Sequence, residues 1–419
     1  MTEQLLSLLL KQSPSLAEIR LKRISNEGLG QIAASHYELS LRSIYTEVNR
    51  DAPEMIKGTC RACPNLRFLH MRNDMAALDG DVIIQAVAQY CPFIEQLSTE
   101  NWILTDAGLN ALASVHTLKE LKVSSDGCSS MACQHVLQSN PNLALLSICV
   151  ADVDEALVRC IGRYCRNLKH SDLTQENSSP LSDDALVELF RGCPLLKLCD
   201  ILKPDGISNV ALSALFQHCP NIVELDLYVH ILLADLPPAG GPILSTLCPS
   251  LTKFKVHGNG IAVRALRDIF TCCTNLREVE LYKCRLLNDE VIQLMAQNCP
   301  SLISLYVREC ANITIIGMSH IATQCSSLKA LDLYHMPAAD EFLIQLSLHC
   351  LGLHSLCLNN CEGDPISEAG VLAVAEACTD LTSLEVRGNV VMPLAPTLQL
   401  MQQRHLFPHI NSCIANIVF

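Results

Sequence analysis

The chain has 419 residues, with 30 basic and 43 acidic side chains and a formal net charge of −13. This acidic balance disfavours broad binding to a nucleic-acid phosphate backbone, which needs a basic stripe. The sequence has no membrane-length apolar run and no basic start or cleavage site typical of a signal peptide, so we expect a soluble protein of the reducing cytoplasm or nucleus, without membrane insertion.

A phrase of the form Cys-Pro-x-Leu-x-x-Leu-x-Leu recurs about every 26 residues along the whole chain. Its plainest copies begin at Cys63, Cys219, Cys248 and Cys299. The anchor positions are 13, 38, 63, 91, 115, 140, 165, 193, 219, 248, 273, 299, 325, 350 and 378. A fixed period of this size indicates stacked units, none of which buries its apolar face alone. We therefore predict one solenoid over residues 1–419, built from about fifteen repeats.

The chain begins inside a repeat. Four apolar residues precede the first anchor at the offsets at which a helix precedes later anchors: Leu5, Leu6, Leu8 and Leu9. Residues 1–12 are therefore predicted to form an N-terminal half-repeat helix. A solenoid must close its core at both ends. This helix either caps the array unaided or is covered by a neighbouring protein.

Each repeat has two halves with different periods. The first alternates apolar and variable residues, as in 223–228, and this period of two predicts a strand with one buried face. The second begins with a Ser or Thr and an acidic residue, as at Thr105-Asp106 and Ser182-Asp183, followed by an apolar stripe. This pattern predicts a capped helix. Alternating strands and helices predict an α/β fold with parallel strands.

At the C-terminus, residues 398–419 hold a decayed copy of the repeat. We expect this segment to be a degenerate capping repeat that closes the core.

These repeats closely resemble the cysteine-containing subtype of the leucine-rich repeat, over essentially the whole chain. The resemblance implies a leucine-rich-repeat solenoid shaped as a horseshoe, with parallel strands on the concave face and helices on the convex face. It also implies that a second cysteine packs inside the turn after the strand, at Cys284, Cys310 and Cys361. Many relatives carry an F-box, a helical module that docks a ubiquitin-ligase scaffold. Residues 1–12 contain no such module, so ligase membership is implied by analogy only.

The 23 cysteines raise the alternatives of disulfides and metal ligands. Eleven are repeat anchors, the total is odd, and no secretory signal is present, so we expect free buried thiols that behave as small apolar residues. Cys60 and Cys63 have metal-ligand spacing, but no second pair stands at zinc-finger distance. We predict no metal site.

Residues five, seven and nine places after each anchor are expected to face the concavity. Tyrosines gather at these positions in the repeats anchored between 219 and 325. Tyrosine is enriched at protein interfaces, although it is also a common strand residue. We predict a partner-binding concave face made by Tyr228, Lys253, Lys255, His257, Tyr282, Tyr306, Arg308, Asp332 and Tyr334. A second surface could form from Glu18, Arg20 and Lys22 near the start of the chain together with Phe68, His70 and Arg72.

Charge alternates across three neighbouring strands of this region. Glu224 and Asp226 are followed by Lys253 and Lys255, and then by two further acids at 278 and 280. Because adjacent strands lie about 4.8 Å apart, each lysine is expected to lie between two acids. We favour self-neutralisation of the ladder over a basic strip for an acidic peptide.

No phosphate loop, nucleophile elbow or His-Glu-x-x-His motif is present, so we predict neither an enzyme nor a cofactor. Two functions remain. The first is a protein-recognition scaffold that binds a partner on its concave face, as in a substrate-recognition component of a ubiquitin-ligase-type complex. The alternative is a permanent structural subunit of a larger multiprotein assembly, such as a cytoskeletal or organellar one.

Overall fold

The computed structural model describes residues 18–20, 32, 41–48, 52–73, 78–100, 102–124, 128–149, 153–174, 181–202, 209–229, 250–258, 263–388 and 390–391. The predicted N-terminal helix (1–12) and C-terminal capping repeat (398–419) lie outside these residues. The chain divides into two compact units, formed by residues 1–202 with 218–220 and by residues 203–217 with 221–419. One continuous solenoid over residues 1–419 stays a prediction.

In the first unit, eight strands pair in parallel in chain order. They are β1 (Glu18–Arg20), β2 (Ser43–Val48), β3 (Phe68–Asn73), β5 (Gln96–Glu100), β7 (Glu120–Ser124), β8 (Leu145–Cys149), β9 (His170–Thr174) and β10 (Leu198–Leu202). The helices are α3 (Ala52–Ala62), α4 (Asp81–Tyr90), α5 (Asp106–Leu112), α6 (Ser130–Ser139), α7 (Glu155–Tyr164) and α8 (Asp183–Gly192). Two short strands, β4 (Leu78–Asp79) and β6 (Trp102–Ile103), pair with each other.

The second unit repeats this plan. Its parallel strands are β11 (Glu224–Val229), β12 (Lys253–Gly258), β13 (Glu278–Tyr282), β14 (Ser304–Arg308), β15 (Ala330–Tyr334), β16 (Ser355–Asn359) and β18 (Ser383–Arg387). Its helices are α9 (Asn209–His218), α10 (Val263–Cys272), α11 (Asp289–Asn298), α12 (Ile315–Gln324), α13 (Asp340–His349) and α14 (Glu368–Ala377). A small pair joins β17 (Ile366–Ser367) to β19 (Val390–Val391).

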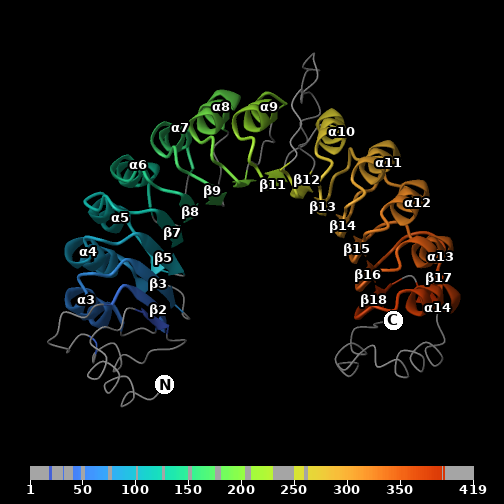
Figure 1. Ribbon diagram of the computed structural model, residues 1–419, viewed down its shortest axis with the longest axis horizontal. Helices are drawn as coiled ribbons and strands as arrows, with labels where there is room; N and C mark the ends of the chain where they lie inside the picture. Colours follow the sequence, from blue (N-terminus) through green and yellow to red (C-terminus); the bar gives the residue numbers. More distant parts are fainter. Residues whose placement is uncertain are drawn as a thin grey trace. The chain divides into compact units, whose positions relative to one another are not determined.

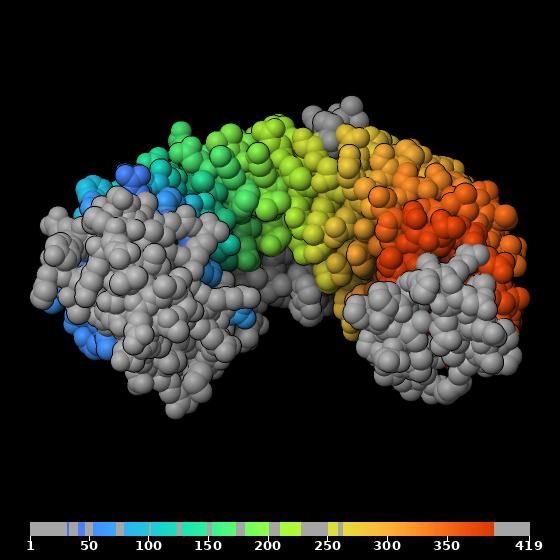
Figure 2. All heavy atoms as spheres, turned by 60° about the horizontal axis from the view of Figure 1, so that its bottom comes forward, coloured from blue at the N-terminus to red at the C-terminus, as the bar shows by residue number. Residues whose placement is uncertain are grey.

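The predicted α/β leucine-rich-repeat solenoid is confirmed. In each unit the strands line one side and the helices the other (Figure 1). The core lies between the two layers. In β13, for example, Val279 and Leu281 are fully buried, whereas the side chains that alternate with them are half-buried on the opposite face of the sheet. Successive repeats of a unit pack directly against one another at the surface (Figure 2). This arrangement follows from the alternation of apolar residues in the sequence.

The anchor cysteines that the structure describes are buried, and several of them donate to the neighbouring repeat. The Sγ atoms of Cys193, Cys350 and Cys378 lie 3.4–3.5 Å from the carbonyl oxygens of the preceding anchors. Asn140 stands in place of an anchor cysteine and is fully buried. Its amide accepts from the Leu118 N–H and donates to the Val136 carbonyl, both at 3.0 Å. Val115 is also buried at an anchor position, so the position takes a small side chain, and those of cysteine and asparagine make hydrogen bonds there.

Every cysteine whose side chain the structure describes is a free thiol. The second-position residues Cys284, Cys310 and Cys361 are buried, as the resemblance implied, and donate to carbonyl oxygens of earlier strands at 3.6–3.9 Å. Within the described part of the chain, no group of three or more His, Cys, Asp or Glu side chains is placed to hold a metal ion.

The acidic residue at the start of several helices has a role beyond its own helix. Asp340, in the first turn of α13, accepts from the backbone N–H (2.8 Å) and hydroxyl (2.5 Å) of Ser367 in the next repeat. Asp289 binds Thr314 in the same way. The hydroxyl of Ser367 in turn caps α14, accepting from the Ala369 N–H. A Cβ on Gly370 would lie 2.4 Å from the Asp340 carboxylate, so glycine leaves room for this bridge.

We expect Asp340→Ala to lower the free energy of unfolding by about 1–3 kcal/mol, because it removes both hydrogen bonds to Ser367. The matched control is Glu341→Ala, which removes an exposed acid from the same helical turn. Urea unfolding followed by circular dichroism measures both. Equal losses in the two variants would mean that the helix dipole, and not the bridge, accounts for the effect.

In the second unit, a residue with a left-handed backbone conformation stands at the end of each strand whose following turn the structure describes. Ten places after the anchors, φ is 101° at Gly258, 56° at Lys283, 52° at Glu309, 49° at His335, 49° at Asn360 and 91° at Gly388. The Lys283 and Glu309 amides donate to the carbonyls of the last residues of β14 and β15, at 2.9 Å. The turn therefore directs the chain away from the sheet immediately after the ninth position.

Candidate functional site

The concave positions of β12 to β15 form one continuous surface, here called the ladder surface. It consists of Lys253, Lys255, His257, Glu278, Glu280, Tyr282, Ser304, Tyr306, Arg308, Ala330, Asp332 and Tyr334. The strands are paired in register, so the ninth-position residues His257, Tyr282, Arg308 and Tyr334 form one row. All twelve residues lie on the face opposite the buried core and are half-buried.

The sequence correctly placed these residues on the face that stays in contact with solvent. Tyr282, Tyr306 and Tyr334 alternate with buried Leu and Val residues of the core. Tyr228 pairs with His257 through the backbone of β11, and its side chain lies outside the described residues. That this surface binds a partner stays a prediction.

The charged end of the ladder surface neutralises itself, as expected. The Nζ atom of Lys253 lies 3.0 Å from Glu224 and 3.2 Å from Glu278. The Nζ atom of Lys255 lies 4.0 Å from Asp226 and 3.9 Å from Glu280. Each lysine therefore lies between two acids of the neighbouring strands. Because both ammonium groups already pair with these acids, they are poorly suited to bind an acidic ligand.

The pKa values reflect the balance between burial and charge. Burial alone lowers the pKa of Lys253, but its hydrogen bonds with Glu224 and Glu278 outweigh burial and raise the pKa above its usual value. Burial raises the pKa of the Asp226 carboxyl, and the nearby His257 and Lys255 offset only part of that rise. The Lys253 ammonium therefore stays charged throughout the physiological range.

The aromatic end of the ladder surface is held in position by neighbouring side chains. The rings of His257 and Tyr282 meet edge to face, with centroids 6.0 Å apart. The Lys283 ammonium lies 4.8 Å from the Tyr282 ring centroid, a cation–π contact. Tyr282 is thus oriented from both sides and still half-exposed.

Arg308 forms an ion pair with Asp332 on the next strand. Its Nε atom is buried and has no acceptor. In the register of the sheet, Arg308 lies between Tyr282 and Tyr334, and Asp332 lies beside Tyr306. The sequence singled out all five residues, but the Arg308–Asp332 ion pair depends on side-chain direction across two strands and could not be read from spacing. The surface therefore combines large aromatic rings with a preorganised ion pair, which suits recognition of a protein.

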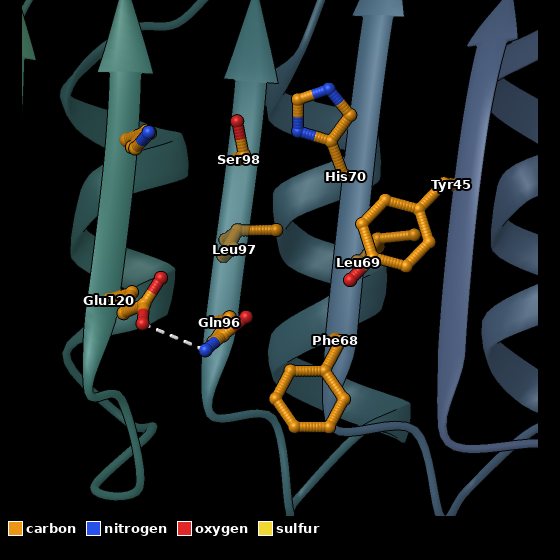
Figure 3. A pocket seen from close by; sticks show the side chains of 9 residues that line it. Tyr45, Phe68, Leu69, His70, Gln96, Leu97, Ser98 and Glu120 are labelled. Carbon is orange, nitrogen blue, oxygen red and sulfur yellow. Dashed lines mark hydrogen bonds between the residues drawn. The ribbon is translucent and has the colours of Figure 1, made fainter. Parts of the chain in front are cut away.

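The first unit has a smaller hollow on its strand side. Tyr45, Phe68 and His70 line it from β2 and β3, opposite Gln96 and Glu120 (Figure 3). The Tyr45 and His70 rings lie 6.1 Å apart, and the Gln96 amide donates to Glu120 at 2.8 Å. The volume is about 180 Å³. A hollow therefore lies at Phe68 and His70, two residues of the predicted second surface. This hollow is large enough for one side chain of a ligand and no more.

Among the residues that the structure describes, no helix is long and apolar enough to span a bilayer.

Comparison with known proteins agrees with the repeat assignment. No protein-family model matches the chain. It is 27% identical over 216 residues to Coronatine-insensitive protein homolog 2 of Oryza sativa, a match that covers 49% of this chain and 32% of that protein. It is 24% identical over 397 residues to GRR1-like protein 1 of Arabidopsis thaliana, covering 90% of this chain and 58% of that protein. A third match is F-box/LRR-repeat protein 4 of Bos taurus, 26% identical over 133 residues and covering 31% of this chain and 21% of that protein.

The chain therefore matches only about a third of the rice relative and a little over half of GRR1-like protein 1. Among solved structures, the fold is similar to a chain of the yeast Rad7–Elc1 complex, with a TM-score of 0.50, 16% identity, and coverage of 93% of this chain and 87% of that one. The predicted resemblance to the repeat region of F-box/LRR proteins is thus confirmed.

Proposed function

We propose that this chain is a non-enzymatic recognition scaffold that binds a protein partner on the ladder surface of its second unit. The observation that carries the proposal is the group of half-exposed rings at Tyr282, Tyr306 and Tyr334, which lie on three neighbouring strands around the Arg308–Asp332 ion pair. Tyrosine and arginine are the residue types that most often dominate binding energy at protein interfaces.

The site favours a protein over a small molecule. The ladder surface is an open strand face whose three rings lie on the successive strands β13, β14 and β15, in two neighbouring rows. Small-molecule sites are concave and bury most of their ligand, whereas a partner's surface can contact all three strands together. The relatives named above support the finer proposal that the partner is a substrate presented to a ubiquitin-ligase-type complex within the cytoplasm or nucleus.

We expect Tyr282→Ala/Tyr306→Ala to weaken partner binding by about 10- to 100-fold, because two anchoring rings are removed. Capture from source-cell lysate with wild-type and variant chain, followed by affinity measurement on the recovered partner, tests this. The control is Tyr90→Ala/Phe93→Ala, which removes two aromatic side chains of the first unit that do not belong to its strands.

Equal affinity of the partner for the tyrosine variant and for the control variant would overturn the assignment to the ladder surface. A partner that cannot be washed away and without which the chain aggregates would instead favour a permanent structural subunit. Recovery of a ubiquitin-ligase scaffold with the wild-type chain would support the finer proposal.

A further inference from the structure

A groove between helices α7 and α8 of the first unit is lined by arginines. Arg159, Arg163, Arg166 and Arg191 border a volume of about 430 Å³. Arg163 and Arg191 stand in the last turns of their helices, and Arg166 follows the end of α7. This concentration of positive charge is unusual for a chain with a net charge of −13.

Two glycines bring the helices together at the floor of this groove. A Cβ on Gly192 would lie 1.7 Å from the Gly162 carbonyl oxygen, and a Cβ on Gly162 would lie 2.6 Å from the Glu188 carbonyl oxygen. Any larger residue would force the two backbones apart. The close approach places arginines from two successive repeats around one groove.

One of the four arginines forms ion pairs with acidic side chains, and the structure describes no such partner for the other three. Arg159 is held by Glu155 at 3.3 Å and Glu188 at 3.0 Å. Within the described part of the chain, Arg163, Arg166 and Arg191 have no ion pair or side-chain hydrogen bond, and all three are exposed. Three guanidinium groups, each able to bind an oxyanion through two N–H donors, therefore surround the groove.

Stabilisation of the two helix ends is the simpler explanation for these residues, since cations there complement the helix dipole. Each helix end carries only about half a negative charge, and Glu155 and Glu188 together carry one more charge than Arg159, so these groups offset roughly two of the three positive charges. The remaining positive charge attracts an anion to the groove.

We propose that the α7–α8 groove binds an acidic segment of a protein partner through its oxyanion groups, either a phosphoryl group or clustered carboxylates. Nucleic acid fits less well, because the basic area covers only two helices and Glu155 and Glu188 interrupt it. The groove lies on the helix side of the first unit, so this proposal does not depend on the ladder surface.

The test measures fluorescence anisotropy of a labelled 12-residue Glu/Asp/Gly peptide with the full chain. Three forms carry phosphoserine, glutamate or serine at the centre, and a 20-nucleotide single-stranded RNA is run in parallel. We expect saturable peptide binding that Arg163→Glu/Arg191→Glu weakens by at least about thirtyfold. Arg163→Lys/Arg191→Lys should weaken it by about three- to tenfold, because lysine keeps the charge but loses the two-pronged donor.

The matched control is Lys169→Glu/Lys197→Glu, which makes the same change of net charge at exposed strand-entry positions of the same unit. It should bind within about twofold of wild type, and all variants should melt near the wild-type temperature because the altered side chains are exposed. Phosphoserine binding at least tenfold tighter than glutamate identifies a phosphoryl ligand, and equal binding identifies carboxylates.

Three outcomes would overturn the proposal. The first is the absence of saturable peptide binding to wild type. The second is an equal loss in the lysine control, which would indicate a general charge effect. The third is tighter, arginine-dependent binding of the RNA.

Discussion

Reversing both lysines of β12 in the variant Lys253→Glu/Lys255→Glu is expected to lower the free energy of unfolding by about 2–5 kcal/mol, and the melting temperature by about 5–15 °C. The variant removes four ion pairs of 3.0–4.0 Å. It also creates six acids on three adjacent strands. Each exposed pair contributes up to about 1 kcal/mol, and like charges facing each other across strands are destabilising by a similar amount.

Salt and charge swapping separate this electrostatic effect from lost packing. The difference from wild type should shrink in 0.5 M sodium chloride, where the Debye length falls to about 4 Å. Combining Lys253→Glu with Glu224→Lys and Glu278→Lys rebuilds one row with opposite sign and should recover most of the stability that Lys253→Glu alone loses. Thermal unfolding at low and high salt measures both. A melting temperature unchanged at low salt would show that the ladder contributes nothing to stability.

Mild alkali is expected to destabilise the protein through its buried thiols, with a loss on the order of 8 kcal/mol between pH 7.5 and pH 9.5. Burial raises the pKa of eight thiols to about 12: Cys63, Cys133, Cys165, Cys299, Cys325, Cys350, Cys357 and Cys361. In the unfolded chain a thiol titrates near pH 8.5–9. Since the folded pKa is the higher one, the stability is fully present below the unfolded pKa. It is lost progressively as the pH rises toward 12.

At pH 9.5 each such thiol lowers stability by about 1 kcal/mol, so the sum approaches the total stability of a typical domain. The Lys253 pKa lies above its usual value, so the Lys253 ammonium stays charged over this window. Urea unfolding under a phosphine reductant at pH 7.5, 8.5 and 9.5 measures the loss. The variant Cys299→Ala/Cys325→Ala should lose about 2 kcal/mol less over the same interval. A stability that does not change over this range would contradict the burial of the thiols.

Spacing alone was sufficient for several features of this protein. The anchor period predicted the strand–helix order, the free cysteines, and the outward direction of Tyr282, Tyr306 and Tyr334. It also predicted that Lys253 lies between acids of two neighbouring strands. These features depend on a single repeated register, so one correct alignment of the repeats determines all of them.

Other features of the structure could not be predicted from the spacing of residues in the sequence. The bond from Asp340 to Ser367 joins residues of different repeats, and its sequence signal is the same as that of an ordinary helix start. The left-handed residues include lysine, glutamate and histidine as well as glycine, so residue type does not mark them. The available arginines at the α7–α8 groove could be found only from side-chain geometry.

The repeat period was enough to predict the layer to which each residue belongs and the row that it occupies on the sheet. This is because the burial of apolar side chains follows the period of about 26 residues in the sequence. The tertiary structure decided which neighbours meet across repeats. It set the Asp–Ser bridges, the Arg308–Asp332 ion pair and the backbone contact of Gly162 with Gly192. These contacts depend on distances between successive coils and on side-chain direction, and neither quantity is encoded in the spacing of residues within one repeat.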